Sequence, residues 1–394
     1  MKPTGILFLC GSAEPGRDGV GDYTRRLAAE LIRRGMRARV VASHDADAVT
    51  LGEDTQEDEG TPVAVLRIPA AIPEEERFDR LQHVVNAFSP DWISLQFVPW
   101  SYSRYGIPRA LARSLARLRT GARFEIMFHE LWLRHRRGSD LKGRATGILQ
   151  RHVILNLVQK LGAEVVHTHI PINRDELAGR GISVRPLPLF ANIGRTSQPN
   201  PEIAAKPPGY YRVAFFSRLE SPPPVEEVLR AIARWCAEKS LRLEIALLGG
   251  GKAKVAAAAA EIQRAVPEAD VLPVGYLSAE DVSSWLATCD LAVSPIPRHS
   301  QGKSGTVAAF LEHHLPVISP VIRQQYEPFF SADLNAMVMD RFDPVTVEEA
   351  ARTFTSHPEL AESLAKITDR FLADLGLTSP LRRDVAAASP KQQP

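Results

Sequence analysis

The sequence of 394 residues has few cysteines, no long apolar run and almost no net charge. Its three cysteines, Cys10, Cys236 and Cys289, lack the spacing of a zinc site and form no even disulfide framework, which favours a reducing, cytoplasmic compartment. No apolar stretch approaches the roughly 20 residues of a membrane-spanning helix. The formal net charge of +2 gives no reason to expect nucleic acid binding.

The sequence instead alternates short apolar runs with stretches of helical period. Apolar runs such as residues 5–10 and 92–98 predict buried strands, and the spacing of apolar residues over 23–35 predicts a helix that ends at Gly35. Strands that alternate with helices predict a parallel sheet covered on both faces. Because the chain is too long for one ordinary core, we expect two such units.

A change in composition divides the two predicted units. Residues 1–193 are expected to form the first domain, and residues 194–210, rich in proline, serine and asparagine, a linker. The alternation restarts over 211–345. The rest is predicted to be helical over 346–378, packing back across the domains, and disordered over 379–394. Ligands of such sheets bind at the carboxyl ends of the strands, so the loops there are the candidate site.

The first such loop is "GRDGVGDYTRRLAAEL", which begins at Gly16. Glycine lets a backbone turn tightly or approach a ligand, and the first turn of the following helix offers unpaired N–H groups. Gly19, Val20 and Gly21 are therefore candidates for an anion or sugar site. The alternative is a plain loop that joins a strand to a helix.

A second glycine-containing stretch, residues 295–319, precedes another predicted helix. It is not a P-loop, because Pro297 stands where that motif needs its first glycine. Four of its residues nevertheless combine an ammonium group, two hydroxyls and N–H groups at a helix start, which predicts an anion site. These residues are Lys303, Ser304, Gly305 and Thr306. A plain capped loop is the alternative.

Taken in order, these motifs resemble the GT-B glycosyltransferases, especially glycosyltransferase family 4. The resemblance spans about residues 5–320 and includes the strand end "MFHE", the "RL" at Arg218 and the glycine turn "LLGGG" at 247–251. It implies an α/β fold of two doubly wound, Rossmann-like parallel-sheet domains that face a central cleft. The N-terminal domain would hold the acceptor and the C-terminal domain the nucleotide-sugar.

The resemblance also implies roles for individual residues. His129 would approach the hydroxyls of the donor sugar, while Arg218 and Lys303 would hold the departing diphosphate. On the acceptor side, loop packing is the alternative for the aromatic rings. The acceptor-side residues are Gln96, Trp100 and Tyr102. The donor-binding residues are Gly19, Val20, Gly21, Gly249, Gly250, Tyr276, Ser304, Gly305 and Thr306.

The chain departs from the family pattern at three positions. The lysine that follows Arg218 in the family falls on Pro223. The two glutamates expected before "LPVIS" fall on Gln301 and Ala309. Lys303 is expected to replace the missing charge. The losses also support an alternative, a GT-B-like binding or scaffold protein with impaired catalysis.

The expected activity is the transfer of a sugar, of hexose type, from a nucleotide-sugar to an acceptor hydroxyl, with retention at the anomeric carbon. No metal or cofactor is expected, and His167 and His169 alone do not make a zinc site. The acceptor would be a sugar, a lipid-linked or a small molecule of bacterial polysaccharide or glycoconjugate biosynthesis. Basic stretches in the N-terminal half suggest peripheral contact with the inner face of a membrane, with solvated helix faces as the alternative. Nucleotide-sugar epimerisation is a further rival.

Overall fold

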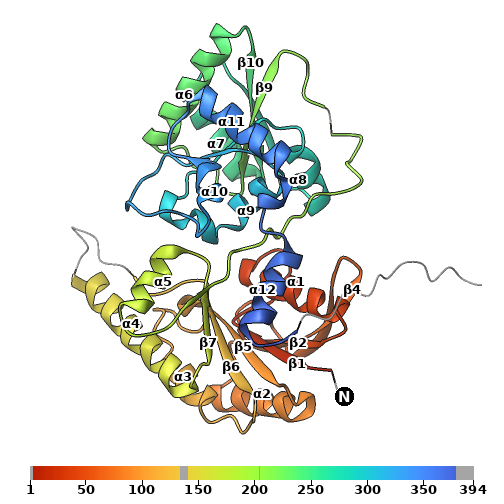
Figure 1. Ribbon diagram of the computed structural model, residues 1–394, viewed down its shortest axis with the longest axis vertical. Helices are drawn as coiled ribbons and strands as arrows, with labels where there is room; N and C mark the ends of the chain where they lie inside the picture. Colours follow the sequence, from red (N-terminus) through yellow and green to blue (C-terminus); the bar gives the residue numbers. More distant parts are fainter. Residues whose placement is uncertain (1–2, 134–140, 204, 379–394) are drawn as a thin grey trace, which may run out of the picture. The chain divides into compact units, whose positions relative to one another are not determined.

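The computed structural model describes residues 3–133, 141–203 and 205–378 (Figure 1). The chain divides into two compact units. Unit 1 comprises Met1–Thr168, Gly181–Arg185 and Leu364–Pro394. Unit 2 comprises His169–Arg180 and Pro186–Ser363.

The sheet of unit 1 has the strand order β3-β4-β2-β1-β5-β6-β7-β8. The neighbouring strands from β4 to β7 pair in parallel, and β3 runs antiparallel to β4. Every residue of β1 is buried, which explains its uninterrupted apolar run. The strands are β1 (Gly5–Cys10), β2 (Arg37–Asp45), β3 (Gly52–Asp58), β4 (Thr61–Pro69), β5 (Trp92–Phe97), β6 (Arg123–Phe128), β7 (Val165–Thr168) and β8 (Arg185–Pro186).

The helices of unit 1 come from both ends of its sequence. They are α1 (Gly19–Arg33), α2 (Glu74–Phe88), α3 (Arg109–Leu115), α4 (Leu141–Leu161), α12 (Leu364–Asp374) and the 3-10 turn η1 (Pro99–Ser101). The C-terminal α12 lies beside α1, as Figure 1 shows in blue and red. Phe371 of α12 stacks on Phe8 of β1 with ring centroids 6.2 Å apart, so the last helix completes the core of the first sheet.

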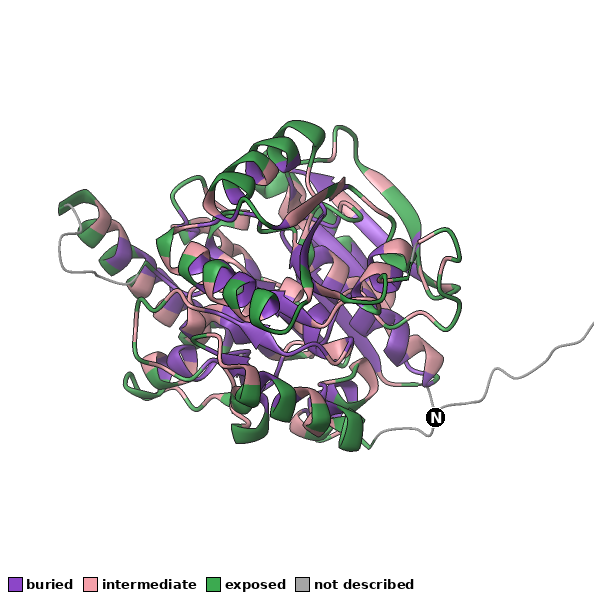
Figure 2. Ribbon diagram, turned by 90° about the horizontal axis from the view of Figure 1, so that it is seen from above, coloured by how far each residue is buried: buried purple, intermediate pink, exposed green. Residues whose placement is uncertain are grey.

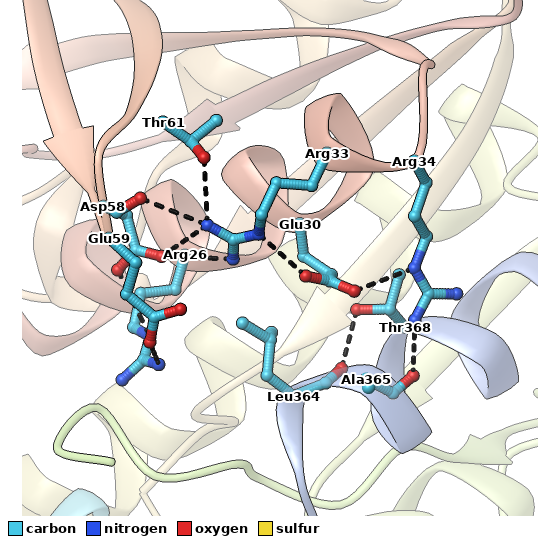
Figure 3. A network of polar contacts seen from close by, with 10 residues as sticks. All are labelled: Arg26, Glu30, Arg33, Arg34, Asp58, Glu59, Thr61, Leu364, Ala365 and Thr368. Carbon is cyan, nitrogen blue, oxygen red and sulfur yellow. Dashed lines mark hydrogen bonds and ion pairs between the residues drawn. The ribbon is translucent and has the colours of Figure 1, made fainter. Parts of the chain in front are cut away.

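A network of charged side chains joins α1 to its neighbours (Figure 3). Glu30 is fully buried, and its carboxylate accepts hydrogen bonds from Arg33 Nε and Arg34 Nε, each at 2.9 Å. Arg34 also donates to the carbonyl of Ala365 at 2.9 Å and pairs with Asp369, both on α12. The network therefore compensates the buried carboxylate and ties α12 to α1.

The sheet of unit 2 has the order β11-β10-β9-β12-β13-β14, and all of its neighbouring strands pair in parallel. The strands are β9 (Tyr210–Phe216), β10 (Arg242–Leu248), β11 (Asp270–Gly275), β12 (Leu291–Val293), β13 (Val317–Ile318) and β14 (Val338–Met339). The helices are α5 (Pro171–Ala178), α6 (Pro223–Glu238), α7 (Lys252–Ala265), α8 (Ala279–Leu286), η2 (Arg298–Lys303), α9 (Gly305–Glu312), α10 (Ala332–Ala336), α11 (Pro344–Ser356) and η3 (Pro358–Leu360). Figure 2 shows buried strands covered by helices that expose one face.

Both sheets reverse their strand order once. The chain leaves β1 toward β2 on one side and later returns to β5 on the other, and it likewise passes from β9 to β10 and returns to β12. Loops diverge at such a reversal and leave a crevice at the carboxyl ends of the two strands. The reversals fall beside the glycine loop at 16–21 in unit 1 and beside Arg218 in unit 2.

The structure adds local detail that the sequence-based prediction did not give. The prediction missed β3, which forms an antiparallel hairpin with β4, and the short helix α5. The segment 194–210 is hydrogen-bonded to α8 of its own unit, for example from Asn200 Nδ2 to Asp281 Oδ1 at 2.7 Å. Of the C-terminal helices, α11 belongs to unit 2 and α12 to unit 1. The tail expected to be disordered, 379–394, lies outside the described residues.

Candidate functional site

The glycine loop of unit 1 is closed by its own aspartate. The Asp18 carboxylate caps α1 and accepts hydrogen bonds from the N–H groups of Val20 and Gly21 at 2.8 and 2.9 Å. Burial raises the pKa of Asp18 although these hydrogen bonds oppose the shift. The two amides predicted to hold a ligand thus already have an acceptor, a capping role that the sequence prediction missed.

The glycines of this loop serve different purposes. A Cβ at Gly21 would lie 2.8 Å from the carbonyl oxygen of Ser12, so this glycine is needed for close packing of α1 on the preceding loop. Gly16 has a φ of +72°, which favours glycine at a turn. Gly16 and Gly19 both have open space where a side chain would be, and Gly19 lies at the first turn of α1, where a ligand could approach the backbone closely.

The ends of β5 and β6 bring two of the predicted residues together. His129 Nε2 lies 2.9 Å from Gln96 Oε1, and both side chains are buried. The ring of Tyr23, from α1, meets the His129 ring edge-on at 5.1 Å between centroids. His129 is therefore held between the sheet and the helix that follows the glycine loop.

A chain of buried hydrogen bonds continues from Gln96 across the sheet. Gln96 Nε2 donates to Ser94 Oγ at 2.7 Å, and Ser94 Oγ donates to Glu125 Oε2 at 2.5 Å. Glu125 Oε1 lies 2.9 Å from His167 Nδ1, and His167 Nε2 lies 3.1 Å from Asp374 Oδ2 of α12. This series of hydrogen bonds thus runs from the candidate site to the last helix of the unit.

The protonation of His167 sets the direction of this chain. Burial alone lowers its pKa, but hydrogen bonds to Asp374 and Glu125 outweigh burial and raise it. A cationic His167 donates at both nitrogens, which keeps Glu125 an acceptor. Ser94 then gives its only proton to Glu125 and must accept from Gln96.

It follows that the carbonyl oxygen of Gln96 faces His129. His129 must then carry a proton on Nε2, and in the neutral ring Nδ1 is the acceptor nitrogen. The series of hydrogen bonds therefore selects one tautomer of His129, the histidine expected to contact the donor sugar. Ser94 and Gln96 are polar residues at alternate positions of β5, so they point to the same face of the sheet, and this spacing could have drawn attention to them. Their partners Glu125 and His129 come from β6 and the residue after it, which the sequence does not show.

The other acceptor-side candidates lie in the loop after β5. Trp100 is partly exposed, whereas Tyr102 stacks on Phe97 with centroids 6.0 Å apart, and burial raises the pKa of its hydroxyl. Tyr102 also lines a pocket of about 300 Å³ between α2 and α3. Trp100 packs beside Gly106, where a Cβ would come within 2.9 Å of the indole ring.

In unit 2 the carboxyl ends of three neighbouring strands turn in left-handed conformations. Ser217, Gly249, Gly250 and Gly275 have φ angles of +62°, +77°, +90° and +83°. A Cβ at Gly249 would lie 3.3 Å from the backbone nitrogen of Ser217, so the glycine lets these turns approach one another. Tyr276 follows directly and is 83% exposed, open to stacking by a planar ligand.

Arg218 stands beside a cation that the sequence prediction missed. Lys254, on α7, donates to the carbonyl of Ser217 at 3.0 Å. Arg218 Nη1 and Lys254 Nζ each lie 3.9 Å from Glu220 Oε1. The two basic side chains are 62% and 48% exposed and thus open to a ligand. Lys254 follows the "GGG" turn in sequence, a signal that could have identified it.

The stretch 295–319 has a more structural role than its sequence indicates. Gln301 is buried and donates to Ser319 Oγ at 2.5 Å and to the carbonyl of Ile296 at 2.6 Å, which joins the segments after β12 and β13. Ala309 is fully buried in the core. Neither position could present a carboxylate to a ligand without disturbing this packing.

The four residues of the predicted anion site in this stretch are partly buried. Ser304 caps α9 by accepting from the N–H of Val307 at 3.3 Å. Gly302 is required by packing, since a Cβ there would lie 2.2 Å from the carbonyl oxygen of Pro328. Lys303 is the last residue of η2, in the segment that connects β12 to α9. Since β12 lies next to β9 in the sheet, Lys303 follows the strand beside the one that precedes Arg218.

No group of three or more histidine, cysteine, aspartate or glutamate side chains in the described part could hold a metal ion. Among the same residues, no helix combines the length and apolar character needed to cross a membrane.

Comparison with known proteins identifies the fold. Residues 18–156, within unit 1, match the family model described as "Glycosyl transferase 4-like domain". The α,α-trehalose 6-phosphate synthase from Burkholderia multivorans superposes with a TM-score of 0.56 and 12% identity, over 95% of this chain and 97% of that one. This chain has the GT-B fold.

Other GT-B structures agree. WaaG, a glycosyltransferase involved in lipopolysaccharide biosynthesis, gives a TM-score of 0.51 at 13% identity, over 94% of this chain and 95% of that one. The UDP-GlcNAc 2-epimerase from Neisseria meningitidis, solved with UDP-GlcNAc, gives 0.50 at 9% identity, over 94% and 99%. A comparison with curated proteins finds no match.

Proposed function

We propose that this GT-B protein is a glycosyltransferase that moves a sugar from a nucleotide-sugar to an acceptor hydroxyl. The observation that carries the proposal is the pair of exposed cations, Arg218 and Lys254, beside left-handed turns at the carboxyl edge of unit 2. A diphosphate needs such charge, and glycine turns allow it to approach the backbone. The family match over residues 18–156 supports the same function.

The proposed reaction places its charge on the leaving group. The acceptor oxygen forms a bond to the anomeric carbon, the bond from that carbon to the diphosphate breaks, and the acceptor proton is released. Negative charge then builds on the nucleoside diphosphate, so fixed cations lower the barrier. Arg218 and Lys254 would stabilise it, with Lys303 and the amides at Ser304 to Thr306 on the side of β12.

On the side of unit 1, His129 would orient the donor sugar. The hydrogen bond to Gln96 and the edge-on contact with Tyr23 would hold its ring in a fixed orientation. Gly19 would allow close approach of backbone to ligand, and Trp100 and Tyr102 would contribute to the acceptor side. We further propose hexosyl transfer with retention, without a metal or cofactor, in bacterial polysaccharide or glycoconjugate synthesis in the cytoplasm.

The competing proposal is a GT-B binding protein without catalysis. In the resembling family two glutamates stand at the positions of Gln301 and Ala309, and their absence favours this proposal. Both side chains are buried in the fold, so neither would contact a ligand. The fold alone does not separate it from an epimerase or a transferase. The cation pair remains in place, however, and it is the part of the site on which departure of a diphosphate depends.

Calorimetric titration with UDP, GDP, ADP and their glucose derivatives tests the donor site. We expect one nucleoside diphosphate to bind, and Arg218→Gln and Lys254→Gln each to weaken that binding about tenfold. Lys252→Gln is the matched control, since Lys252 is exposed on the same helix. Equal binding by all four proteins, or no binding at all, would contradict the proposed donor site.

Turnover then separates the transferase from the binding protein. With the nucleotide-sugar that binds, slow hydrolysis to the nucleoside diphosphate and free sugar is expected, and it should fall in His129→Ala and Lys303→Gln. A nucleotide-sugar that binds tightly but releases no sugar over days would favour the binding protein.

A further inference from the structure

A pocket in unit 1 is left without a role by the contacts described so far. It has a volume of about 300 Å³ and lies between α2 and α3, next to Ser43 and His44 near the end of β2. Its apolar lining comes mainly from Phe78, Leu81 and Leu111. A cavity of this size is at the lower limit of small-molecule sites.

The charge around the pocket is strongly one-sided. Three arginines line it, Arg77, Arg109 and Arg113, against one acidic residue, Glu74. Glu74 Oε1 already accepts a hydrogen bond from Ser114 Oγ at 2.7 Å. Within the part of the chain that the structure describes, none of the three arginines has a carboxylate within 4.0 Å. The excess of positive charge is thus open to an anion.

Arg77 is the innermost of these cations by its contacts. Its Nη1 donates to the carbonyl of Ser43 at 3.3 Å, while its buried Nε has no acceptor among the described residues. Burial lowers the pKa of Arg77, although Glu74 opposes the shift. Arg77 lines the pocket, and its guanidinium carries more N–H donors than the one that bonds Ser43, so it can also donate to an anion held there.

One side of the pocket is hydrogen-bonded to the loop that follows β1. The N–H of His44 donates to the carbonyl of Gly11, the first residue after β1, at 3.1 Å. The ring of Tyr102, which also lines the pocket, lies 6.3 Å from the His44 ring between centroids. His44 and Tyr102 therefore place part of the lining near the carboxyl ends of β1 and β5.

We infer that this pocket binds a small organic phosphate whose apolar part lies on Phe78 and Leu111 and whose phosphate is held by Arg77, Arg109 and Arg113. At about 30 Å³ for each water-sized group, the volume holds about ten non-hydrogen atoms. That is room for a phosphate and a short chain or single ring. That such a ligand is the sugar acceptor rests on the proposed glycosyltransferase function, whereas its binding does not.

The probe is hexyl phosphate, titrated into the full-length protein by calorimetry without nucleotide. Arg109→Gln and Arg113→Gln should each weaken its binding about tenfold. Both side chains are exposed, so the variants should fold normally, which thermal melting checks. Arg144→Gln, at an exposed arginine of α4 outside the pocket, is the matched control. Inorganic phosphate and 1-hexanol, which carry only one half of the probe each, should bind at least tenfold more weakly.

Three results would overturn the inference. The first is hexyl phosphate binding that Arg109→Gln and Arg113→Gln leave unchanged. The second is inorganic phosphate binding as tightly as the probe, which would mean a surface charge without a pocket. The third is that the protein sediments with vesicles of phosphatidylcholine and phosphatidic acid but does not bind hexyl phosphate. The arginines would then form a surface that binds an anionic membrane.

UDP titration on the same preparations separates this inference from the proposed function. UDP binding without hexyl phosphate binding would overturn the pocket alone. Hexyl phosphate binding without any nucleotide binding would support the pocket and overturn its assignment to a sugar acceptor.

Discussion

At the scale of single residues, His167 couples the stability of unit 1 to pH. Its folded pKa is raised, because hydrogen bonds to Asp374 and Glu125 outweigh the opposing effect of burial. A raised pKa contributes stability that is fully present below the unfolded pKa of about 6.5 and is lost as pH rises through the folded value. His167 therefore stabilises the fold more in weak acid than in weak base.

We expect His167→Gln to lower the free energy of unfolding by about 3–5 kcal/mol at pH 6, since it leaves the buried carboxylate of Glu125 without its cation, while Asp374 keeps its pair with Arg185. The difference from wild type should shrink as pH rises above about 6.5. Urea unfolding at several pH values measures it. His357→Gln, at an exposed histidine, is the control. A difference that stays constant or grows toward pH 9 would mean that His167 is neutral in the fold.

The tautomer of His129 gives a second prediction at this scale. Gln96→Leu removes the acceptor of the Nε2 proton and leaves a buried donor unpaired, which should cost about 1–3 kcal/mol of stability. Turnover of the nucleotide-sugar should fall while binding of the nucleoside diphosphate, which depends on unit 2, stays unchanged. Unaltered turnover in a folded Gln96→Leu protein would show that the selected tautomer has no part in the reaction.

Single residues also show where sequence reasoning reaches its limit. His129 and Arg218 could be picked out because each follows a recognisable apolar strand. Asp18 could not, because its role comes from its side chain folding back onto the amides of its own loop. Lys254 was missed, although its place after the glycine turn was a usable signal. Gly21 looked like a ligand contact, yet its missing side chain is explained by packing against Ser12.

At the scale of elements, the charge network of Figure 3 fixes α12 to α1. Glu30→Ala should destabilise unit 1 by about 3–5 kcal/mol, because Arg33 and Arg34 would remain largely buried without their shared carboxylate. Hydrogen exchange of residues 364–374 should speed up as well. Glu348→Ala breaks an exposed pair with Arg352 on α11 and should cost no more than about 0.5 kcal/mol. Equal effects of the two variants would contradict the network.

Elements with a clear apolar period were predicted, and those defined by pairing were not. The strand β3 reads "GEDTQED" and has no apolar alternation. It pairs with β4 through a tight hairpin turn at Glu59 and Gly60, whose φ angles are +48° and +73°. Glutamate before glycine is not a usual signal for this turn, so the hairpin depends on tertiary pairing at the sheet edge.

At the scale of the whole molecule, the two units differ in how they depend on the chain. The core and donor-site residues of unit 2 all come from residues 169–363. Unit 1 is built from the first 168 residues but needs α12, which supplies Phe371 to its core and Asp374 to His167. The core of unit 1 is thus complete only after the second unit has been synthesised.

Truncation after Ser363 should therefore separate the two stabilities. Removing α12 uncovers Phe8 and breaks the contacts of Arg34 and His167, so unit 1 should unfold at a lower temperature or lose its cooperative transition. Nucleoside diphosphate binding should persist, because Arg218 and Lys254 lie in the unit that stays whole. Truncation after Thr378, which keeps all of α12, is the control and should melt like the full chain. Loss of nucleotide binding in the shorter protein alone would mean that the donor site needs an intact first unit.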